Sequence, residues 1–277
     1  MARIISPEAE KLLDVEIKVL DRGFVRLVDY LGSDERIVQA ARVSYGKGTT
    51  TVSRDKELID YLLRHRHTSP FEQVVITIHA KMPIFVARQW VRHRTARINE
   101  LSGRYSEMKD ELYVPEPDRV KPQDTFNRQS SLEEAQVPPE MQKKVVEIIS
   151  RDQGTAYASY REMLDDGISR ELARINLPLA LYTEWYWQID FNNLFHFLKL
   201  RMDQHAQWEI RQYANAIARL ARAVAPLAYE SFEDQILYGA SFSRTEINSL
   251  REMIAGRPCP LTGRKLKEFN KKMGFEE

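Results

Sequence analysis

Residues 73–92, QVVITIHAKMPIFVARQWVR, hold signals for two kinds of secondary structure in one stretch of chain. Gln73 to Met82 is rich in Val, Ile and Thr, which predicts a β-strand. Pro83 follows, and because proline is tolerated at the first helical position, Ile84 to about Arg92 is expected to be helical. The stretch therefore contributes both a strand and a helix to the predicted fold.

A basic segment, residues 92–106 (RHRTARINELSGRYS), begins where that predicted helix ends. It holds four arginines and one histidine, and Glu100 is its single acid. An ordinary solvated helix face would instead interleave both signs of charge at i,i+4 spacing. Arginine forks match phosphate oxygens, and Ser102 and the backbone at Gly103 can add short donors. The segment therefore predicts a phosphorylated ligand.

The rest of the chain predicts a helix-rich α+β fold, in which a small antiparallel sheet is packed with long helices. Val15 to Leu20 and Phe24 to Leu31 predict a β-hairpin, and Leu181 to Ile189 a further strand. The proline-rich residues 114–138 predict a long surface loop. Helical spacing occurs in residues 34–43, 54–66, 140–164, 169–175, 193–202, 208–224 and, within the tail, 246–254.

The length of 277 residues allows one large domain or two small ones, and we expect one globular unit, residues 1–234, followed by a C-terminal extension, residues 235–277. The hydrophobic content of 43% over 277 residues is sufficient for a real core. The net charge of +1 provides no global field to attract nucleic acid or a membrane surface, so any cationic site is local. No apolar run approaches the roughly 20 residues that span a bilayer, and the first residues lack a signal-like apolar core. A cytoplasmic location is expected.

Several common kinds of site are not indicated. His65, His67, Asp203 and His205 could supply metal ligands, but neighbouring arginines would repel a divalent cation and no His-Glu-x-x-His pattern occurs. No metal site is expected. The lone Cys259 excludes an internal disulfide. Neither Gly-x-Gly-x-x-Gly nor a Walker-type loop occurs, so a nucleotide must be held in another way.

Three further segments mix Arg or His with small hydrogen-bonding residues, 64–72 (RHRHTSPFE), 169–174 (SRELAR) and 200–209 (LRMDQHAQWE). Taken singly, Arg174 and Arg201 fit ordinary surface ion pairs or the favourable interaction of a cation with a helix C-terminus. Only in combination with the basic segment do they favour a ligand site.

Read together, these segments closely resemble the flavin-dependent thymidylate synthases. The family motif Arg-His-Arg-x-x-Ser-x-Asn-Glu-x-Ser-x-Arg matches residues 92–104 with one departure, Arg97 in place of the first serine, and residues 200–209 match a later motif. The added cation at Arg97 could strengthen phosphate binding or point to solvent. The resemblance extends from about residue 16 to about residue 230, and it includes residues 20–25, 40–44, 69–72 and 83–90.

The resemblance implies reductive methylation of dUMP to dTMP, with methylene-tetrahydrofolate as carbon donor, FAD as redox carrier and NADPH as hydride source. It also implies a homotetramer with FAD sites between subunits. The cysteine count agrees, because the unrelated folate-oxidising enzymes need a thiolate nucleophile and Cys259 lies outside the matching region. The sequence does not indicate the folate site, the order of hydride and methylene transfer, or the role of the extension.

By family match, Arg201 is the expected catalytic residue, because a guanidinium aimed at the uracil edge favours an enolate-like form that is more nucleophilic at C5. Positions matching substrate contacts are Gln89, Trp90, Val91, Arg92, Glu100, Leu101, Ser102, Gly103, Arg104, Arg174 and Arg201. Positions matching cofactor contacts are Ser44, His67, Ser69, Glu72, Arg92, His93, Arg94, Glu100, Asp190, Phe191, Asn192, His196 and His205. Asparagine is familiar in some members at the positions of Asp190 and His196.

Two other classes of function compete with this interpretation. An RNA-binding module could use the Arg/His clusters with Tyr105 or Trp90, but the near-neutral charge and the absence of an RNA-recognition motif count against it. Alternatively, the cations could be internal ion-pair partners in a helical oligomer. Flavin binding by the purified protein would separate the enzyme from both.

Overall fold

The computed structural model of the protein describes residues 3–43, 52–124, 131–132 and 135–275. The chain forms two compact units, residues 1–228 and residues 229–277.

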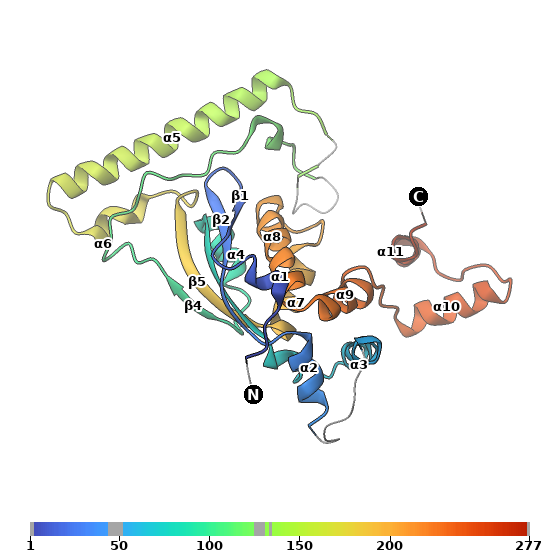
Figure 1. Ribbon diagram of the computed structural model, residues 1–277. Coiled ribbons are helices and arrows are strands. Elements are labelled where there is room, and N and C mark those ends of the chain that lie inside the picture. Colours follow the sequence, from blue (N-terminus) through green and yellow to red (C-terminus); the bar gives the residue numbers. More distant parts are fainter. Residues whose placement is uncertain (1–2, 44–51, 125–130, 133–134, 276–277) are drawn as a thin grey trace. The chain divides into compact units, whose positions relative to one another are not determined.

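An antiparallel five-stranded sheet forms the centre of the first unit in the described part of the chain (Figure 1). The strand order is β1-β2-β3-β5-β4, so the predicted strand of residues 73–82 lies in the middle of the sheet. The strands are β1 (Glu16–Val19), β2 (Gly23–Leu31), β3 (Val75–Pro83), β4 (Arg97–Glu100) and β5 (Tyr182–Asp190). The predicted α+β class with a small antiparallel sheet is confirmed.

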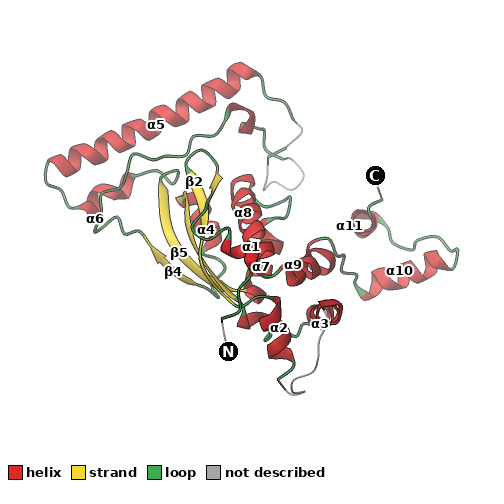
Figure 2. Ribbon diagram, in the orientation of Figure 1, coloured by secondary structure: helices red, strands yellow, loops and turns green. Residues whose placement is uncertain are grey.

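Helices surround this sheet, and Figure 2 shows α4, α7 and α8 together against one of its faces. The short 3₁₀ helices Phe71–Gln73, Pro117–Arg119 and Arg174–Asn176 join longer elements. The α-helices are α1 (Pro7–Glu10), α2 (Asp34–Ala41), α3 (Val52–Arg64), α4 (Ile84–Trp90), α5 (Pro139–Asp165), α6 (Arg170–Ala173), α7 (Phe191–Arg201), α8 (Trp208–Val224) and α9 (Pro226–Phe232), which continues into the second unit.

An aromatic cluster fills the space between the sheet and these helices. Trp90, at the end of α4, is fully buried and meets the rings of Trp185 and Trp187 on β5 nearly edge-on, with centroids 5.2 Å apart in both pairs. Phe197 on α7 lies 5.2 Å from the same ring. Because large aromatic side chains bury about 150–250 Å² each, this cluster holds α4 and α7 firmly against the sheet.

A second, smaller core lies beneath the long helix α5. Tyr160 is buried there, and its hydroxyl accepts the N–H of Met108 at 2.9 Å. The Tyr157 hydroxyl donates to the carbonyl of Met108 at 3.0 Å. Leu112, Ala173 and Leu181 complete the buried set. The helix therefore fixes the loop that follows the basic segment and the short helix α6 beside it.

The second unit contains a π-helical turn (Glu233–Leu237) and two α-helices, α10 (Arg244–Ile254) and α11 (Gly263–Met273). Ser243 and Glu246 form a capping box at the start of α10. Lys272 of α11 donates to Glu246 at 2.7 Å, and this contact, with the N-cap bonds, lowers the pKa of Glu246 to about 2. Within the described residues of the whole chain, no helix is long and apolar enough to span a membrane.

Some elements differ from the sequence-based prediction. Strand β4 was not predicted, because all four of its residues are exposed and show no alternation of apolar and polar side chains. Residues 169–175 form α6 followed by a 3₁₀ turn, not one helix, and α2 ends at Ala41, short of Val43. The short helices α1 and α9, and α11 in the tail, were also missed.

Two glycines give a matched test of the packing. A Cβ added at Gly23 would overlap the Tyr213 hydroxyl and lie 2.6 Å from the Val19 carbonyl and 2.8 Å from the Lys81 carbonyl. Gly154, in the middle of α5, has nothing within 4 Å of such an atom. We expect Gly23→Ala to lower the free energy of unfolding by about 1–3 kcal/mol through overpacking. Gly154→Ala should raise it by about 0.5–1 kcal/mol.

Urea unfolding of both variants, followed by tryptophan fluorescence, measures these changes. Equal effects of the two substitutions would contradict the close approach of the β1–β2 hairpin to Tyr213.

Candidate functional site

The C-terminal ends of α4 and α7 meet at Arg201. Its Nε donates to Nε2 of His93 at 3.0 Å, and its Nη2 donates to the carbonyl oxygen of Gln89 at 2.9 Å. His93 follows α4 in a turn, where its N–H donates to the carbonyl of Trp90 at 3.0 Å. Since a guanidinium has five N–H donors, the remaining ones are left for other partners. The packing of Trp90 thus positions the Gln89 carbonyl and the His93 ring, which accept these two hydrogen bonds from Arg201.

His93 is a neutral imidazole in this arrangement. It is 9% exposed and meets the ring of Phe197 edge-on, with centroids 4.9 Å apart. Burial, together with the charges of Arg201 and His196, lowers the pKa of His93 to about 4. Because Nε of arginine always carries a hydrogen, Nε2 of His93 accepts and the ring proton is assigned to Nδ1. Burial also lowers the pKa of Arg201.

Other predicted residues lie around this centre. The side-chain amide of Gln89 donates to that of Gln207, in the segment between α7 and α8. His205 in the same segment contacts Asp203, with 2.8 Å between Nδ1 and the carboxylate oxygen. Arg92 and Arg94 flank His93 and are both exposed. The centre therefore carries a surplus of hydrogen-bond donors at the surface.

Gly103 and Arg174 form a second group. A Cβ at Gly103 would lie 3.2 Å from Cδ and 3.3 Å from Nη1 of Arg174, and 2.8 Å from Sδ of Met108. Gly103 is buried, and the Arg174 side chain lies against it, where the glycine has no side chain of its own. Because of this close approach, a residue with a side chain would crowd Met108 and Arg174 at this position.

Arg104 is held less firmly at the edge of this second group. It pairs with Glu171 at 3.0 Å, and both side chains are 59% exposed. Exposed ion pairs of this kind contribute about 0–1 kcal/mol to folding stability, so an anionic ligand could replace the Glu171 carboxylate beside Arg104. Its backbone N–H also lies 3.4 Å from the Ser102 hydroxyl. No hydrogen bond or ion pair between described residues joins this group to Arg201.

Glu100 and Leu101 lie at the β4 edge of the sheet, and Val91 follows α4. The Glu100 carboxylate accepts from the Thr183 hydroxyl at 2.7 Å, and the Leu101 N–H donates to the Glu184 carbonyl at 2.9 Å. Leu101 and Val91 are 39% and 40% exposed. Trp90 differs from them, because its side chain is in the core and only its backbone could reach a ligand.

A third group lies near the start of α7. The His67 ring packs against Tyr61, with centroids 5.8 Å apart, and Ser69 and Glu72 are exposed. The 3₁₀ helix Phe71–Gln73 contacts both α7 and β5. Asp190 caps α7 by accepting from the backbone and the side chain of Asn193, at 3.0 and 2.7 Å. Ser44 lies outside the described residues.

Helix α7 connects these positions. Phe191 at its start is fully buried with four other apolar residues, whereas His196 is exposed and Asn192 is partly exposed, one helical turn apart. Arg201 ends the helix. A helix of 11 residues is about 16 Å long at 1.5 Å per residue. The positions matched to the cofactor and to catalysis are therefore spread along one helix, on a scale that suits a dinucleotide.

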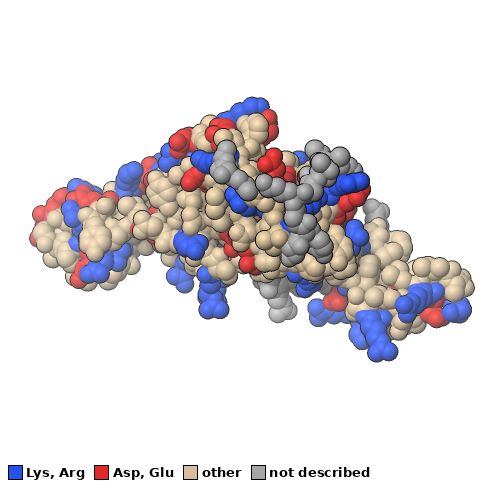
Figure 3. Space-filling model, turned by 60° about the horizontal axis from the view of Figure 1, so that its bottom comes forward, with Lys and Arg blue, Asp and Glu red and all other residues tan. Residues whose placement is uncertain are grey.

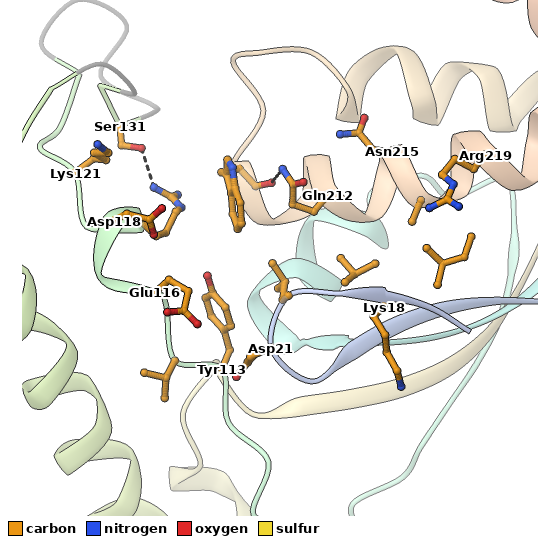
Figure 4. Close-up of a pocket in the computed structure, with 17 residues that line it drawn as sticks. Lys18, Asp21, Tyr113, Glu116, Asp118, Lys121, Ser131, Gln212, Asn215 and Arg219 are labelled. Carbon is orange, nitrogen blue, oxygen red and sulfur yellow. Dashed lines mark hydrogen bonds between the residues drawn. The ribbon is translucent and has the colours of Figure 1, made fainter. Parts of the chain in front are cut away.

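A separate cavity of about 790 Å³ lies between the β1–β2 hairpin, the loop around Tyr113 and helix α8 (Figure 4). Beside it, Arg119 donates to Glu209 at 2.8 Å, and the Glu209 side chain is only 5% exposed. None of the predicted site residues is among the described residues that line this cavity. The sequence analysis missed it because its walls come from segments far apart in the chain.

Among the described residues, no group of three His, Cys, Asp or Glu side chains could hold a metal ion. On the face shown in Figure 3, Lys and Arg side chains lie in small groups separated by acidic and uncharged residues. That face offers no broad cationic surface for nucleic acid.

Comparison with known proteins identifies the family. The protein-family model described as "Thymidylate synthase complementing protein" matches residues 26–227. The flavin-dependent thymidylate synthase of Treponema denticola is 57% identical over 261 residues, which cover 94% of this chain and 98% of that protein. The chain belongs to the flavin-dependent thymidylate synthase family. The resemblance and the enzyme class predicted from the sequence are confirmed.

Further comparisons support this assignment. A flavin-dependent thymidylate synthase from Thermus thermophilus is 56% identical over 238 residues, 86% of each chain. A crystal structure of the UMP/dUMP methylase PolB from Streptomyces cacaoi, bound with 5-Br dUMP, has a TM-score of 0.72 and 31% identity, and covers 80% of this chain and 99% of that one. The model "Thymidylate synthase ThyX C-terminal domain" matches residues 240–274, so the likeness continues past residue 230.

The low pKa of His93 predicts how folding stability depends on pH. An unfolded histidine titrates near pH 6.5, so below that pH the unfolded chain binds a proton that folded His93 rejects until about pH 4. The contribution of His93 to the free energy of unfolding should be complete above pH 6.5 and decline as the pH falls towards 4.

NMR titration of the histidine rings, assigned with a His93→Gln variant, measures this pKa directly. Titration of His93 near pH 6.5 would contradict the neutral imidazole beside Arg201.

Proposed function

We propose that this protein methylates dUMP reductively to dTMP, with methylene-tetrahydrofolate as carbon donor, FAD as redox carrier and NADPH as hydride source. The observation that carries this proposal is the placement of Arg201, whose guanidinium donates to two neutral acceptors and, as far as the described residues go, has further N–H groups left for a ligand. Membership of the flavin-dependent thymidylate synthase family supports the same reaction. The 5-Br dUMP bound to the related PolB supports a pyrimidine nucleotide as substrate.

The second group of residues suits the phosphate of dUMP. Arg174 lies against the backbone of Gly103, so a phosphate at this loop would meet a guanidinium and main-chain N–H groups together. Arg104 can exchange its exposed pairing with Glu171 for the phosphate. The Ser102 hydroxyl adds a short donor. These residues bind and orient the nucleotide.

Arg201 would act on the uracil ring. Donors fixed in place beforehand stabilise charge that develops on a carbonyl oxygen, and the loss of one such donor typically raises the barrier by about 3–4 kcal/mol. The free N–H groups of Arg201 would stabilise the enolate-like form of uracil, which is the better nucleophile at C5. The half-buried position of Arg201 strengthens this interaction because water screens it less.

The remaining donors fit a flavin nucleotide. Arg92 and Arg94 are exposed cations beside His93, and Ser69 and His67 are exposed near the start of α7. This set of guanidinium, imidazole and hydroxyl groups suits the diphosphate and ribose of FAD. Bound flavin would supply the redox chemistry that side chains lack. The protein contributes binding along α7, with Asn192 and His196 on its accessible side.

We also propose that neighbouring subunits of a homotetramer complete the site. Among the described residues, no hydrogen bond or ion pair joins the Gly103–Arg174 group to Arg201, although both must reach one nucleotide. Three apolar side chains near Arg174 are strongly exposed, Leu172 at 54%, Ile175 at 73% and Leu179 at 54%. Exposed apolar residues beside a polar site are typical of a subunit interface.

Anaerobic turnover tests the proposal. The parent protein should form dTMP from dUMP, methylene-tetrahydrofolate, FAD and NADPH. Arg201→Ala should lower turnover by about 10²–10³-fold, since a preorganised donor is lost. The control is Arg219→Ala, which removes an exposed arginine of α8 at the other cavity. No dTMP from the parent would defeat the assignment, and equal losses in both variants would defeat the role of Arg201.

Gly103→Ala tests the phosphate group separately. The added methyl would meet Met108 and displace Arg174, so we expect the Kd of dUMP to rise at least about tenfold while FAD binding changes little. Equilibrium titration of dUMP and of FAD gives both values. An unchanged Kd for dUMP would place the phosphate elsewhere.

A further inference from the structure

Within the part of the chain that the structure describes, one side-chain hydrogen bond, from Arg201 to His93, helps to orient the guanidinium. Arginine has a long, flexible stem with about 2 kcal/mol of rotamer entropy. The Gln89 carbonyl holds one terminal nitrogen, Nη2, whereas Nε donates to His93 at 3.0 Å. Since Nε lies within the rigid guanidinium plane, fixing Nε and Nη2 together fixes the plane.

We propose that His93 is a positioning residue for the reaction, which accepts the Nε–H of Arg201 and thereby directs the remaining N–H groups of the guanidinium to the pyrimidine. This inference rests on the proposed function. It assigns His93 a role that acts through Arg201, in addition to the cofactor contact implied by its place in the motif.

The chemistry of an uncharged acceptor explains why a histidine suits this position. A carboxylate here would pair with the guanidinium and neutralise the charge that the uracil needs. A lysine or arginine would repel it. The imidazole Nε2 accepts a hydrogen bond and leaves the full positive charge of Arg201 directed at the substrate. The ring is 9% exposed, so water competes little for this bond.

The surroundings keep the imidazole in place. Phe197 of α7 packs edge-on against the ring, at 4.9 Å between centroids. The ring of His196 also lies near, with centroids 5.7 Å apart. Phe197 contacts Trp90 in the aromatic cluster as well, so the same packing fixes both ends of the His93–Arg201 bond.

Two polar variants test whether the hydrogen-bond acceptor at Nε2, and not another property of the imidazole ring, is what the reaction needs. In His93→Gln, the amide oxygen can reach the position of Nε2 and accept from Arg201. In His93→Asn, the shorter amide reaches only the position of Nδ1. Both variants are neutral and polar, so they form a matched pair. His93→Leu removes every acceptor at similar volume.

The experiment measures kcat and flavin affinity of the holoenzyme for these variants, each in the parent and in an Arg201→Lys background. A hydrogen bond to a charged group corresponds to roughly tenfold to hundredfold in rate. We expect a loss of that size in kcat for His93→Asn and His93→Leu, and recovery of most of it in His93→Gln. In the Arg201→Lys background, the kcat values of the three His93 variants should differ from one another by less than about twofold, because lysine has no Nε–H to donate to residue 93.

Losses that are the same in both backgrounds would overturn the positioning role, as would a His93→Gln variant as slow as His93→Asn. Changes in flavin affinity without a change in kcat at saturating flavin would also overturn it. A parent enzyme that forms no dTMP would instead defeat the proposed function, so the two failures are distinguishable. Comparison at saturating flavin excludes loss of the cofactor as the cause.

Discussion

The packing of Trp90 between the sheet, α4 and α7 is the constraint on which the rest of the site depends. Its ring is fully buried, edge-on to two tryptophans of β5 and in contact with Phe197. The indole nitrogens of these three tryptophans have no hydrogen-bond partner among the described residues, so apolar and aromatic contacts stabilise this cluster. Because Trp90 ends α4 and Phe197 lies on α7, their contact sets where Gln89, His93 and Arg201 meet.

The electrostatics around Arg201 follow from this geometry. Among the described residues, the acceptors of Arg201 are a carbonyl oxygen and a neutral imidazole, and neither cancels the charge of the guanidinium. In contrast, the exposed Arg104 pairs with the carboxylate of Glu171. Charge that is left uncompensated in a partly buried position is available to a ligand, and it is screened less than charge at the surface. Helix α7, which ends at Arg201, also carries the accessible polar side chains of His196 and Asn192 towards its N-terminus.

The sequence predicts the parts of this account that are local. Local sequence is enough to predict β3 from its β-branched residues, the start of α4 from Pro83, and α5 and α8 from their helical periodicity. In contrast, β4 is exposed at all four residues and shows no alternation of apolar and polar side chains. The family motif identified Arg201 and His93, but nothing in the spacing predicts that their side chains touch, since 108 residues separate them. The cavity at Tyr113 and Trp208 was missed for the same reason. Trp90, expected at the substrate, has its side chain in the core, so only its backbone could meet a ligand.

The central claim is that one neutral imidazole and one carbonyl aim the guanidinium of Arg201 at the pyrimidine. A crystal structure of the protein with flavin and dUMP bound tests it most directly. The account predicts that Nε of Arg201 stays on His93, Nη2 stays on the Gln89 carbonyl, and a free N–H group faces a uracil oxygen. A structure in which Arg201 leaves His93 and turns away from the bound nucleotide would contradict it.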